Sequence, residues 1–406
     1  MAQIYPFRAI HYSRELASKI ADLATPPYDV ISETEKAALA RRHAYNMVHL
    51  DLPVNTSGDA FYEHSRKQFN EWCRSGVLTQ DETASFYLLR ETYIESGQRA
   101  ERIGIFARVK IEKPETNVIL PHERTLDKPF QDRLQLLRAS QANYSPVFFV
   151  YEDERLGVEQ LAADVAQDKP LFSYTDDLGI KRALWSISET AKIDQIQQTL
   201  SNKTLIIADG HHRYRTAAAY LTENSAADTL LGYLVNSRQK DFIIKPIHRF
   251  LRIRSLNPEF SFKEFVARLK NGCQIETDVS LPEDLADLKI PRGTIVCHET
   301  DTHQTLAILT ARGSTSEAIE TVAFERLIAG GALGLSEQQI QKGAISYFHS
   351  KEEYREICAQ GGLLVFLLPA LQFHDILRIC RSGGVLPQKS TFFYPKVPTG
   401  LVINRL

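Results

Sequence analysis

The sequence predicts a fold of mixed α and β structure, of the α+β or α/β class. Of its 406 residues, 43% are apolar and 24% are charged, which is close to the average of soluble globular proteins and excludes a disordered or fibrous chain. Short runs rich in β-branched and aromatic residues alternate along the chain with amphipathic stretches. Strands that are interleaved with helices are typical of these fold classes.

Each element is predicted from its local pattern, in chain order. Short runs of apolar, β-branched and aromatic residues predict strands. These runs are residues 47–52, 85–90, 103–111, 146–151, 204–208, 230–235, 294–298, 306–309 and 363–368. Apolar residues that recur at a spacing of three or four predict helices. These stretches are residues 33–43, 60–75, 128–142, 156–166, 189–200, 211–222, 261–270, 350–359 and 370–381.

The charge of the chain is nearly balanced. Its 48 basic and 50 acidic residues leave a formal net charge of −2, and its longest basic runs are pairs. A protein that grips nucleic acid is usually basic overall or in a block. No apolar run reaches the length of about 18 residues that a membrane-spanning helix needs. We therefore expect neither a nucleic-acid partner nor a membrane partner.

The cysteines and the N-terminus indicate a cytoplasmic protein. Five scattered cysteines show none of the short spacings of a zinc knuckle or a redox motif. Such a set predicts free thiols in a reducing compartment. The first ten residues lack the charged and apolar pattern of a signal peptide.

The strongest local signal is a strand that runs into a turn and then a helix. Residues 205–208 are apolar, Asp209 and Gly210 follow, and the apolar positions 214–221 recur at helical spacing. Gly210 lets the backbone approach a ligand closely. The pattern therefore predicts a helix that opens directly after Gly210.

His211, His212 and Arg213 fall in the first turn of that helix. The helix macrodipole is positive at this end, so potential cations there call for a compensating anion. A phosphate is the natural anion, because free backbone N–H groups and Arg213 would converge on it. The alternative is that Asp209 caps the helix and the histidines lie on the surface.

A second segment places a carboxylate between two basic side chains. Pro121 ends an apolar run, and His122, Glu123 and Arg124 follow. A carboxylate flanked by His and Arg keeps a low pKa, which suits a base or a metal ligand. Asp132 and Arg133 begin the next helix. The alternative is a solvated charged loop.

The third segment is the C-terminal tail, residues 387–400. It carries Lys389 and Lys396 with hydroxyl side chains among three prolines and three aromatic residues. Lysines and hydroxyls beside fixed turns can hold an anion, and we expect both lysines near the phosphate site. Aromatic burial that clamps the tail to the core is the alternative.

Several motifs together resemble, nearly end to end, the prokaryotic family named domain of unknown function 1015. The motifs are Pro6-Phe-Arg-Ala, Pro26-Pro-Tyr-Asp-Val-Ile, Leu120-Pro-His-Glu-Arg-Thr, Asp132-Arg, Ser145-Pro, Ala208-Asp-Gly-His-His-Arg-Tyr and Gln388-Lys-Ser-Thr-Phe-Phe-Tyr-Pro-Lys. The family name implies no activity.

The motifs Pro-His-Glu and Asp-Gly-His-His-Arg also resemble the ParB/sulfiredoxin-like superfamily, and within it the free L-serine kinases. That resemblance implies Glu123 as the catalytic base. It implies a phosphate site at Asp209, Gly210, His211, His212 and Arg213, with Mg²⁺ at Asp209. His122, Arg133, Lys389 and Lys396 complete the expected nucleotide site, and Asp209 is a second catalytic candidate.

The resemblance covers roughly residues 109–249 and predicts three segments. Residues 1–108 form an N-terminal α/β segment. Residues 109–254 form a ParB/sulfiredoxin-like mixed-sheet core with an insertion near 152–203. Residues 255–406 form a C-terminal α/β segment whose tail, 385–406, folds back. In this arrangement Glu123 should lie within about 15 Å of Asp209, so that one substrate can bridge them.

Two other activities of the superfamily fit the sequence poorly. Sulfiredoxins need a cysteine where this chain has His211, so the nucleophile for sulfinic-acid reduction is missing. ParB proteins bind DNA through a helix-turn-helix region, and this slightly acidic chain has no obvious recognition helix.

Three functions follow from this reading. The first is a nucleotide-dependent kinase of a small hydroxylated metabolite, serine-kinase-like, with ATP or ADP as donor and Mg²⁺. The second is a non-catalytic nucleotide-binding regulatory protein, and the third is a phosphoester hydrolase that uses the same phosphate site. The expected partners are a nucleotide and a small-molecule substrate, and a homodimer is compatible with them.

Overall fold

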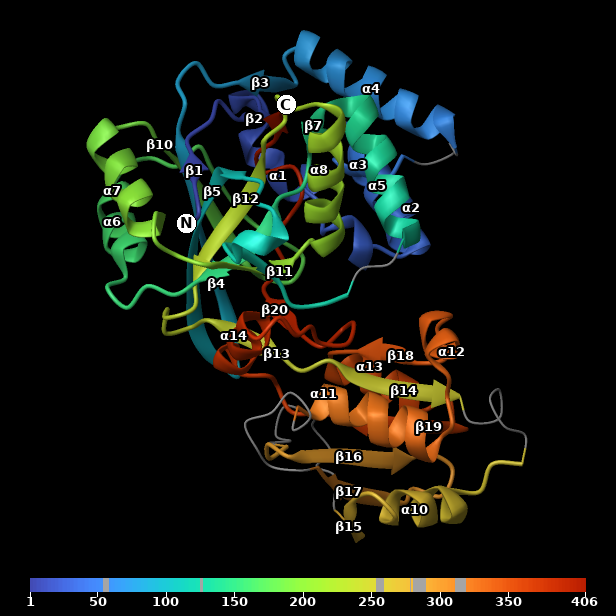
Figure 1. Cartoon of the computed structure of the whole chain (residues 1–406). Helices are drawn as coiled ribbons and strands as arrows, with labels where there is room; N and C mark the ends of the chain where they lie inside the picture. Colours follow the sequence, from blue (N-terminus) through green and yellow to red (C-terminus); the bar gives the residue numbers. More distant parts are fainter. Residues whose placement is uncertain (54–57, 125–126, 253–258, 278, 280–289, 311–318) are drawn as a thin grey trace. The chain divides into compact units, whose positions relative to one another are not determined.

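The computed structural model describes residues 1–53, 58–124, 127–252, 259–277, 279, 290–310 and 319–406 (Figure 1). The chain divides into two compact units. Unit 1 comprises Met1–Pro121, Thr125–Ile243 and Pro395–Leu406, and unit 2 comprises His122–Arg124 and Ile244–Tyr394. These units differ from the three segments expected from the sequence. The expected boundary at residue 108 falls inside one long strand, and the tail is divided between the units.

Unit 1 is built on a mixed sheet that has nine strands among the described residues. In order, these are β6 (Ile119–Pro121), β11 (Leu205–Asp209), β8 (Val147–Tyr151), β12 (Thr229–Asn236), β5 (Gln98–Lys110), β4 (Phe86–Glu95), β10 (Lys181–Ile187) and β9 (Phe172–Thr175), with β1 (Ile4–Tyr5) on β5. The pairs β6–β11 and β8–β12 are parallel, and the other pairs are antiparallel.

The sequence-predicted fold class is confirmed. The strands predicted at 103–111, 204–208 and 230–235 are β5, β11 and β12 of this one sheet. The insertion expected near 152–203 holds β9 and β10, and β10 pairs with β4, so the insertion extends the sheet.

Helices α6 (Gly157–Val165), α7 (Thr190–Leu200) and α8 (His211–Glu223) pack on one face of this sheet. The buried residues of α6 and α7, and Ala217 of α8, belong to one core cluster with Ile105, Ala107 and Val109, the alternate residues of β5. Figure 1 shows α6 beside α7 and α8 beside α5. The other helices of unit 1 are α1 (Ile20–Leu23), α2 (Glu33–Arg42), α3 (Val48–Asp51), α4 (Asp59–Arg74) and α5 (Asp127–Ser140).

Short elements complete unit 1. The strand pairs are β2 (Ile10–Tyr12) with β3 (Leu78–Gln80), and β7 (Ala142–Asn143) with β21 (Asn404–Arg405). Three 3₁₀ turns span Arg14–Lys19, Tyr28–Val30 and Pro114–Thr116. No helix in the described ranges combines the length and the apolar character that crossing a bilayer requires.

The strand predicted at residues 47–52 is wrong, because this segment forms helix α3. The side chain of Asn46 accepts a hydrogen bond from the Val48 N–H at 3.0 Å, which favours a helical turn. Met47, Val48 and Leu50 are all buried. A short apolar run that is buried on every side has no periodicity that separates helix from strand.

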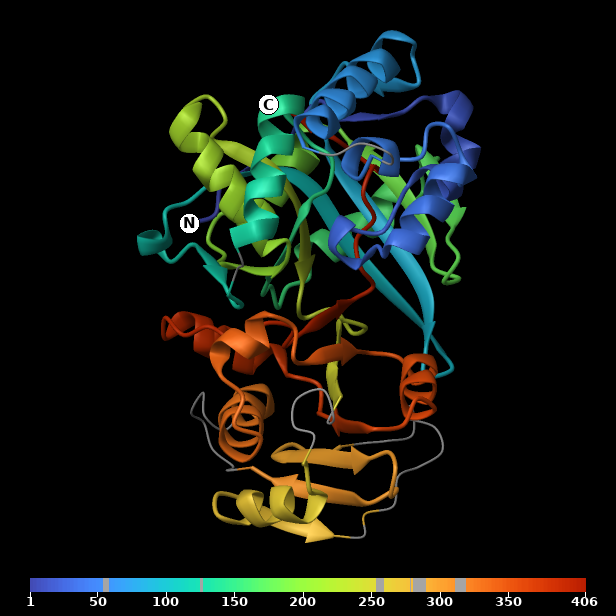
Figure 2. The ribbon, with the colours of Figure 1, turned by 90° about the vertical axis from the view of Figure 1, so that its right-hand side faces the viewer.

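Unit 2 contains an antiparallel sheet with both faces covered. Its order is β15 (Gln274–Thr277), β17 (Thr305–Leu309), β16 (Thr294–Glu299), β19 (Leu363–Leu367), β14 (His248–Arg252) and β18 (Ser346–Phe348). Figures 1 and 2 both show α10 (Phe262–Lys270) beside β15 and β17. The remaining elements are α11 (Glu320–Ala323), a π-helix (Phe324–Ala332), α12 (Glu337–Gln341), α13 (Lys351–Cys358), α14 (Phe373–Arg381), and the pair β13 (Ile243–Lys245) and β20 (Phe392–Tyr394).

The central strands of unit 2 are apolar on both sides. In β19, Leu364 and Phe366 pack with α10 and the π-helix, whereas Leu363, Val365 and Leu367 pack with α13. Two covered faces explain why β19 reads as a continuous apolar run rather than as an alternating one.

The buried His248 of β14 makes the stability of unit 2 depend on pH. Burial, with the neighbouring charges of Arg249 and His349, lowers the pKa of His248 to about 3. An unfolded histidine has a pKa of about 6.5, so unfolding takes up a proton at any pH between these values. The free energy of unfolding is therefore not reduced by His248 above about pH 6.5, and it decreases as the pH falls below that value. We expect a loss of about 1 kcal/mol between pH 7.5 and 5.5.

Denaturant unfolding at these two pH values measures the loss. The matched control is His248→Gln, which cannot titrate in this range and should reduce the pH dependence by that amount. An identical pH dependence in the two proteins would contradict the buried, uncharged state of His248.

Candidate functional site

The predicted strand, turn and helix around Asp209 is confirmed. Strand β11 ends at Asp209, Gly210 adopts the left-handed conformation with φ of 88°, and α8 begins at His211. The first turn of α8, all of which is described, holds no acidic residue and no capping side chain. The N-terminus of α8 therefore presents its positive end without a local carboxylate on the helix itself.

Asp209 is a largely buried carboxylate between two cations. Its Oδ1 accepts a hydrogen bond from the Lys396 ammonium, and its Oδ2 accepts one from Arg213 Nη2 at 2.5 Å. Burial raises the pKa of Asp209, but the charges of Lys396 and Arg213 lower it by more, so that this pKa is held well below its usual range. Asp209 is therefore ionised at neutral pH. The three side chains together carry one net positive charge.

Lys396 reaches Asp209 from the far end of the chain, and its backbone is anchored in unit 1. Arg182 Nη2 donates to the Lys396 carbonyl at 3.4 Å. Arg182 itself pairs with Glu91, which also binds Arg102, and all three side chains are buried. This network gives the segment around Lys396 a rigid support.

Arg213 is held by neutral oxygen atoms as well as by Asp209. Its Nη1 donates to Ser145 Oγ at 2.6 Å and to the Pro146 carbonyl. A Cβ at Gly210 would lie 2.9 Å from Arg213 Nε. The guanidinium therefore packs on the bare backbone of the turn, which only glycine permits.

Replacing Gly210 with Ala should displace Arg213 and cost about 1–2 kcal/mol of stability, because alanine is strained at positive φ. The matched control is Gly179→Ala in the same unit, where φ is 75° and a Cβ would meet no described atom within 4 Å. Backbone strain should lower the free energy of unfolding of both variants. Only Gly210→Ala should lower it further, because it also loses the contact with Arg213. Denaturant unfolding of both proteins measures the difference, and equal losses would show that the packing on Gly210 is unimportant.

A small cavity of about 50 Å³, lined by apolar and polar residues, adjoins Arg213. Asp51 Oδ2, Arg213 Nε and Thr216 Oγ1 are buried, belong to residues that line this cavity, and have no hydrogen-bond partner in the described part of the chain. Buried polar atoms without partners are costly and call for a ligand or an ordered water. The sequence offered no sign of Asp51 or Thr216.

Arg133, expected to bind phosphate, holds Asp51 in place. Its Nη1 donates to Asp51 Oδ1 at 2.8 Å, its Nε donates to Asp132 Oδ2 at 2.7 Å, and its guanidinium lies 4.3 Å from the centre of the Tyr28 ring. Burial raises the pKa of Asp51 although the Arg133 charge lowers it. Two carboxylates and an aromatic face thus engage this guanidinium.

Glu123 lies in unit 2, where three successive backbone N–H groups hold its carboxylate. The N–H groups of Lys389, Ser390 and Thr391 donate to it at 3.3, 3.1 and 3.3 Å. Thr391 Oγ1 is 3.3 Å from Glu123 Oε1 and 2.7 Å from Nε2 of the buried His122. The tail thus brings Lys389 to Glu123 and Lys396 to Asp209.

The two motifs leave the same edge of the unit 1 sheet. Strands β6 and β11 are parallel, with Pro121 opposite Ile207, and the chain continues from Pro121 into His122 and Glu123. That Glu123 and Asp209 act on one substrate stays a prediction.

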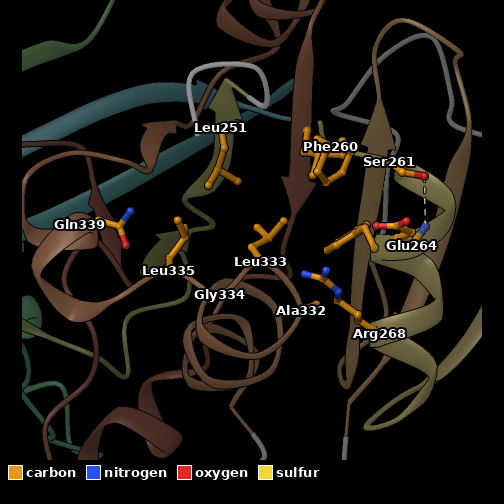
Figure 3. A pocket seen from close by; sticks show the side chains of 12 residues that line it. Leu251, Phe260, Ser261, Glu264, Arg268, Ala332, Leu333, Gly334, Leu335 and Gln339 are labelled. Carbon is orange, nitrogen blue, oxygen red and sulfur yellow. Dashed lines mark hydrogen bonds between the residues drawn. The ribbon is translucent and has the colours of Figure 1, made fainter. Parts of the chain in front are cut away.

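A larger pocket, of about 210 Å³, lies in unit 2 (Figure 3). Ser261, Glu264 and Arg268 border it from α10 and its start, and Leu333, Gly334 and Leu335 border it after the π-helix. None of the site residues expected from the sequence is among its lining residues.

The donor set around Asp209 does not fit a resident Mg²⁺. Each carboxylate oxygen already accepts a hydrogen bond from a cationic side chain. Among the residues that the structure describes, no group of three or more His, Cys, Asp or Glu side chains gathers as a metal site. Mg²⁺ is usually bound by one or two carboxylates together with substrate phosphates. The Mg²⁺ implied by the resemblance is therefore not supported by these side chains.

Several solved structures are similar to the chain at low sequence identity. A free serine kinase in complex with AMP is 16% identical, with a TM-score of 0.38, over 73% of this chain and 92% of that chain. SbnI with a C-terminal truncation, from Staphylococcus aureus, is 10% identical, with a TM-score of 0.39, over 72% of this chain and 85% of that chain. A conserved hypothetical protein from Pyrococcus furiosus is 13% identical, with a TM-score of 0.36, over 73% of this chain and 95% of that chain.

A comparison with curated proteins gives no match. The family model described as "Protein of unknown function (DUF1015)" matches residues 4–356, which is most of the chain. This match confirms the family that the motifs indicate. The chain belongs to the DUF1015 family.

Proposed function

We propose that the chain binds a nucleotide by its phosphates at the N-terminus of α8 and transfers a phosphoryl group to a small hydroxylated metabolite, as free L-serine kinases do. One observation carries the proposal. Arg213 and Lys396 leave the cluster around Asp209 with one net positive charge, at a helix N-terminus whose first turn has no acidic residue. Such a site attracts phosphate through the dipole, the backbone N–H groups and the side chains together.

The residues of the turn have distinct roles in this proposal. Gly210 lets the phosphates approach the backbone N–H groups of His211, His212 and Arg213. Arg213 and Lys396 bind phosphate oxygens and neutralise the charge that develops during transfer. Asp209 keeps the two cations together and returns to them when the phosphate leaves. No step requires a metal ion at Asp209.

The small cavity beside Arg213 is the proposed place for the polar end of the acceptor. Asp51 Oδ2 can accept a hydrogen bond there, and Thr216 Oγ1 can donate or accept one. An acceptor that satisfies these buried atoms gains more than one that leaves them unpaired. The cavity therefore favours a compact acceptor that presents a polar group to these atoms.

Glu123 is the proposed base. In the transfer, the acceptor hydroxyl oxygen forms a bond to phosphorus, the bond to the leaving phosphate breaks, and the hydroxyl proton passes to the Glu123 carboxylate. The parallel exit of β6 and β11 supports this role, because the Glu123 motif and the Asp209 motif follow from neighbouring strand ends.

Turnover tests the proposed function and separates it from its alternatives. Purified protein is incubated with ATP or ADP and a pool of hydroxylated metabolites, with and without Mg²⁺. The masses of the metabolites are then measured by mass spectrometry. A kinase yields a metabolite heavier by one phosphoryl group. A regulatory protein binds the nucleotide without consuming it, and a hydrolase releases phosphate with water as the only acceptor. Either of the last two results would overturn the proposal.

A further inference from the structure

The backbone of residues 389–391 forms an anion-binding concavity that the protein fills with its own carboxylate. Three consecutive N–H groups converge on Glu123, which is the arrangement that backbone nests use for phosphate and carboxylate groups. Lys389 has φ of 55°, a conformation that a residue other than glycine adopts at a cost. Ser390 Oγ donates to the Pro387 carbonyl at 2.6 Å and fixes the turn. The concavity is therefore held open by local contacts and not only by Glu123.

A buried cation stands behind this concavity. Arg249 of β14 is 2% exposed, and its guanidinium donates to the carbonyls of Ile247 at 2.7 Å and of Lys389 at 3.4 Å. Within the described residues no carboxylate forms an ion pair with it. Burial lowers the pKa of Arg249 to about 10, and the charges of Glu325 and, to a smaller extent, Glu123 oppose this lowering only in part. A phosphate dianion in place of Glu123 would set more negative charge near Arg249 than one carboxylate does.

We propose that the N–H groups of Lys389–Thr391, backed by Arg249, are a binding site for a phosphate-type oxyanion, and that Glu123 is the internal anion a ligand must displace. A carboxylate and a phosphate both offer oxygen acceptors to converging N–H groups, so the two compete for one place. The site shares no residue with the Asp209 cluster, and oxyanion binding at these N–H groups does not require nucleotide binding at Asp209. If the proposed function also holds, the same displacement frees Glu123 to accept a proton.

Removing Glu123 should therefore strengthen oxyanion binding at this turn. The experiment titrates inorganic phosphate into full-length protein labelled with ¹⁵N at serine and threonine, and follows the amide signals of Ser390 and Thr391. All proteins carry Arg213→Ala, which weakens binding at the Asp209 cluster. Glu123→Ala should bind phosphate at least about tenfold more tightly than the protein with Glu123, because the loss of one charge-assisted competitor is worth that factor or more.

Glu352→Ala is the control, because it removes one exposed carboxylate of α13 and so changes the charge of unit 2 equally. It should leave the affinity for phosphate unchanged. Glu123→Gln, which keeps the side-chain shape, should give an intermediate affinity and serves if Glu123→Ala does not fold. Two results would overturn the proposal. One is an equal affinity for phosphate with and without Glu123, and the other is phosphate binding that leaves the amide signals of Ser390 and Thr391 unshifted. Nucleotide binding measured in protein with native Arg213 tests the Asp209 cluster separately.

Discussion

Replacing Glu123 with Gln should lower phosphoryl transfer by about 10²–10⁴-fold, the usual contribution of a general base. Glutamine keeps the shape of the side chain and removes the charge that accepts the hydroxyl proton. Nucleotide affinity should change little, because the phosphates bind at the Asp209 turn in unit 1. Steady-state rates and thermal melts on the same sample measure both effects, with Glu352→Gln as a charge-matched control.

A purely structural role for Glu123 predicts a different pair of results. The carboxylate holds three N–H groups of the tail, so Glu123→Gln would then lower the melting temperature with little specific loss of rate. Full activity in this variant would eliminate Glu123 as the base and point to Asp209 instead.

Replacing Arg213 with Ala should weaken nucleotide binding by about 1.5–3 kcal/mol, which is the value of a hydrogen bond to a charged group and corresponds to roughly 10–150-fold in affinity. The control lies two residues further along α8. Arg215 is also a guanidinium, but it packs 4.2 Å from the ring centre of Phe130. Equilibrium titration of ATP and ADP should therefore find Arg215→Ala close to the unaltered protein.

Lys396→Ala should weaken binding in the same direction, since it removes the second cation from the cluster. If both Arg213→Ala and Lys396→Ala fold and bind the nucleotide with unchanged affinity, the N-terminus of α8 is not the phosphate site.

The local parts of the site were predictable from the sequence, because strand, turn and helix each leave a short-range pattern. Three features lie within about twenty residues of one another: the apolar run of β11, the glycine at positive φ and the apolar stripe of α8. The helical spacing of that stripe can be read directly from the sequence. The same reasoning fixed most of the longer strands and helices. These elements are specified by neighbours in sequence, so one sequence suffices to find them.

The long-range parts were less predictable. The sequence suggested that both lysines of the tail lie near the phosphate site, but not that Lys396 contacts Asp209 while Lys389 lies with Glu123 in unit 2. Asp51 lies in an apolar run whose pattern predicts a strand, but the run forms α3. The residues next to Asp51 in the sequence do not indicate that its carboxylate becomes buried against Arg133.

Strand β10 was missed for a physical reason. Leu184, Trp185 and Ile187 are buried in it, but a fourth buried residue is Arg182, which reads as a surface residue in a hydrophobic pattern. The guanidinium is buried because Glu91 of β4 neutralises it. An ion pair between two strands that are neighbours in the sheet but distant in sequence thus replaces the apolar residue that the pattern requires.

Nucleotide phosphates should replace Asp209 as the partner of Arg213 and Lys396 at the N-terminus of α8. A crystal structure of the protein with ADP tests it most directly. We expect phosphate oxygens within hydrogen-bond distance of the backbone N–H groups that follow Gly210, with Arg213 and Lys396 turned toward them. ADP bound elsewhere, for example in the pocket between α10 and the π-helix, with the contacts of Asp209 intact, would contradict it.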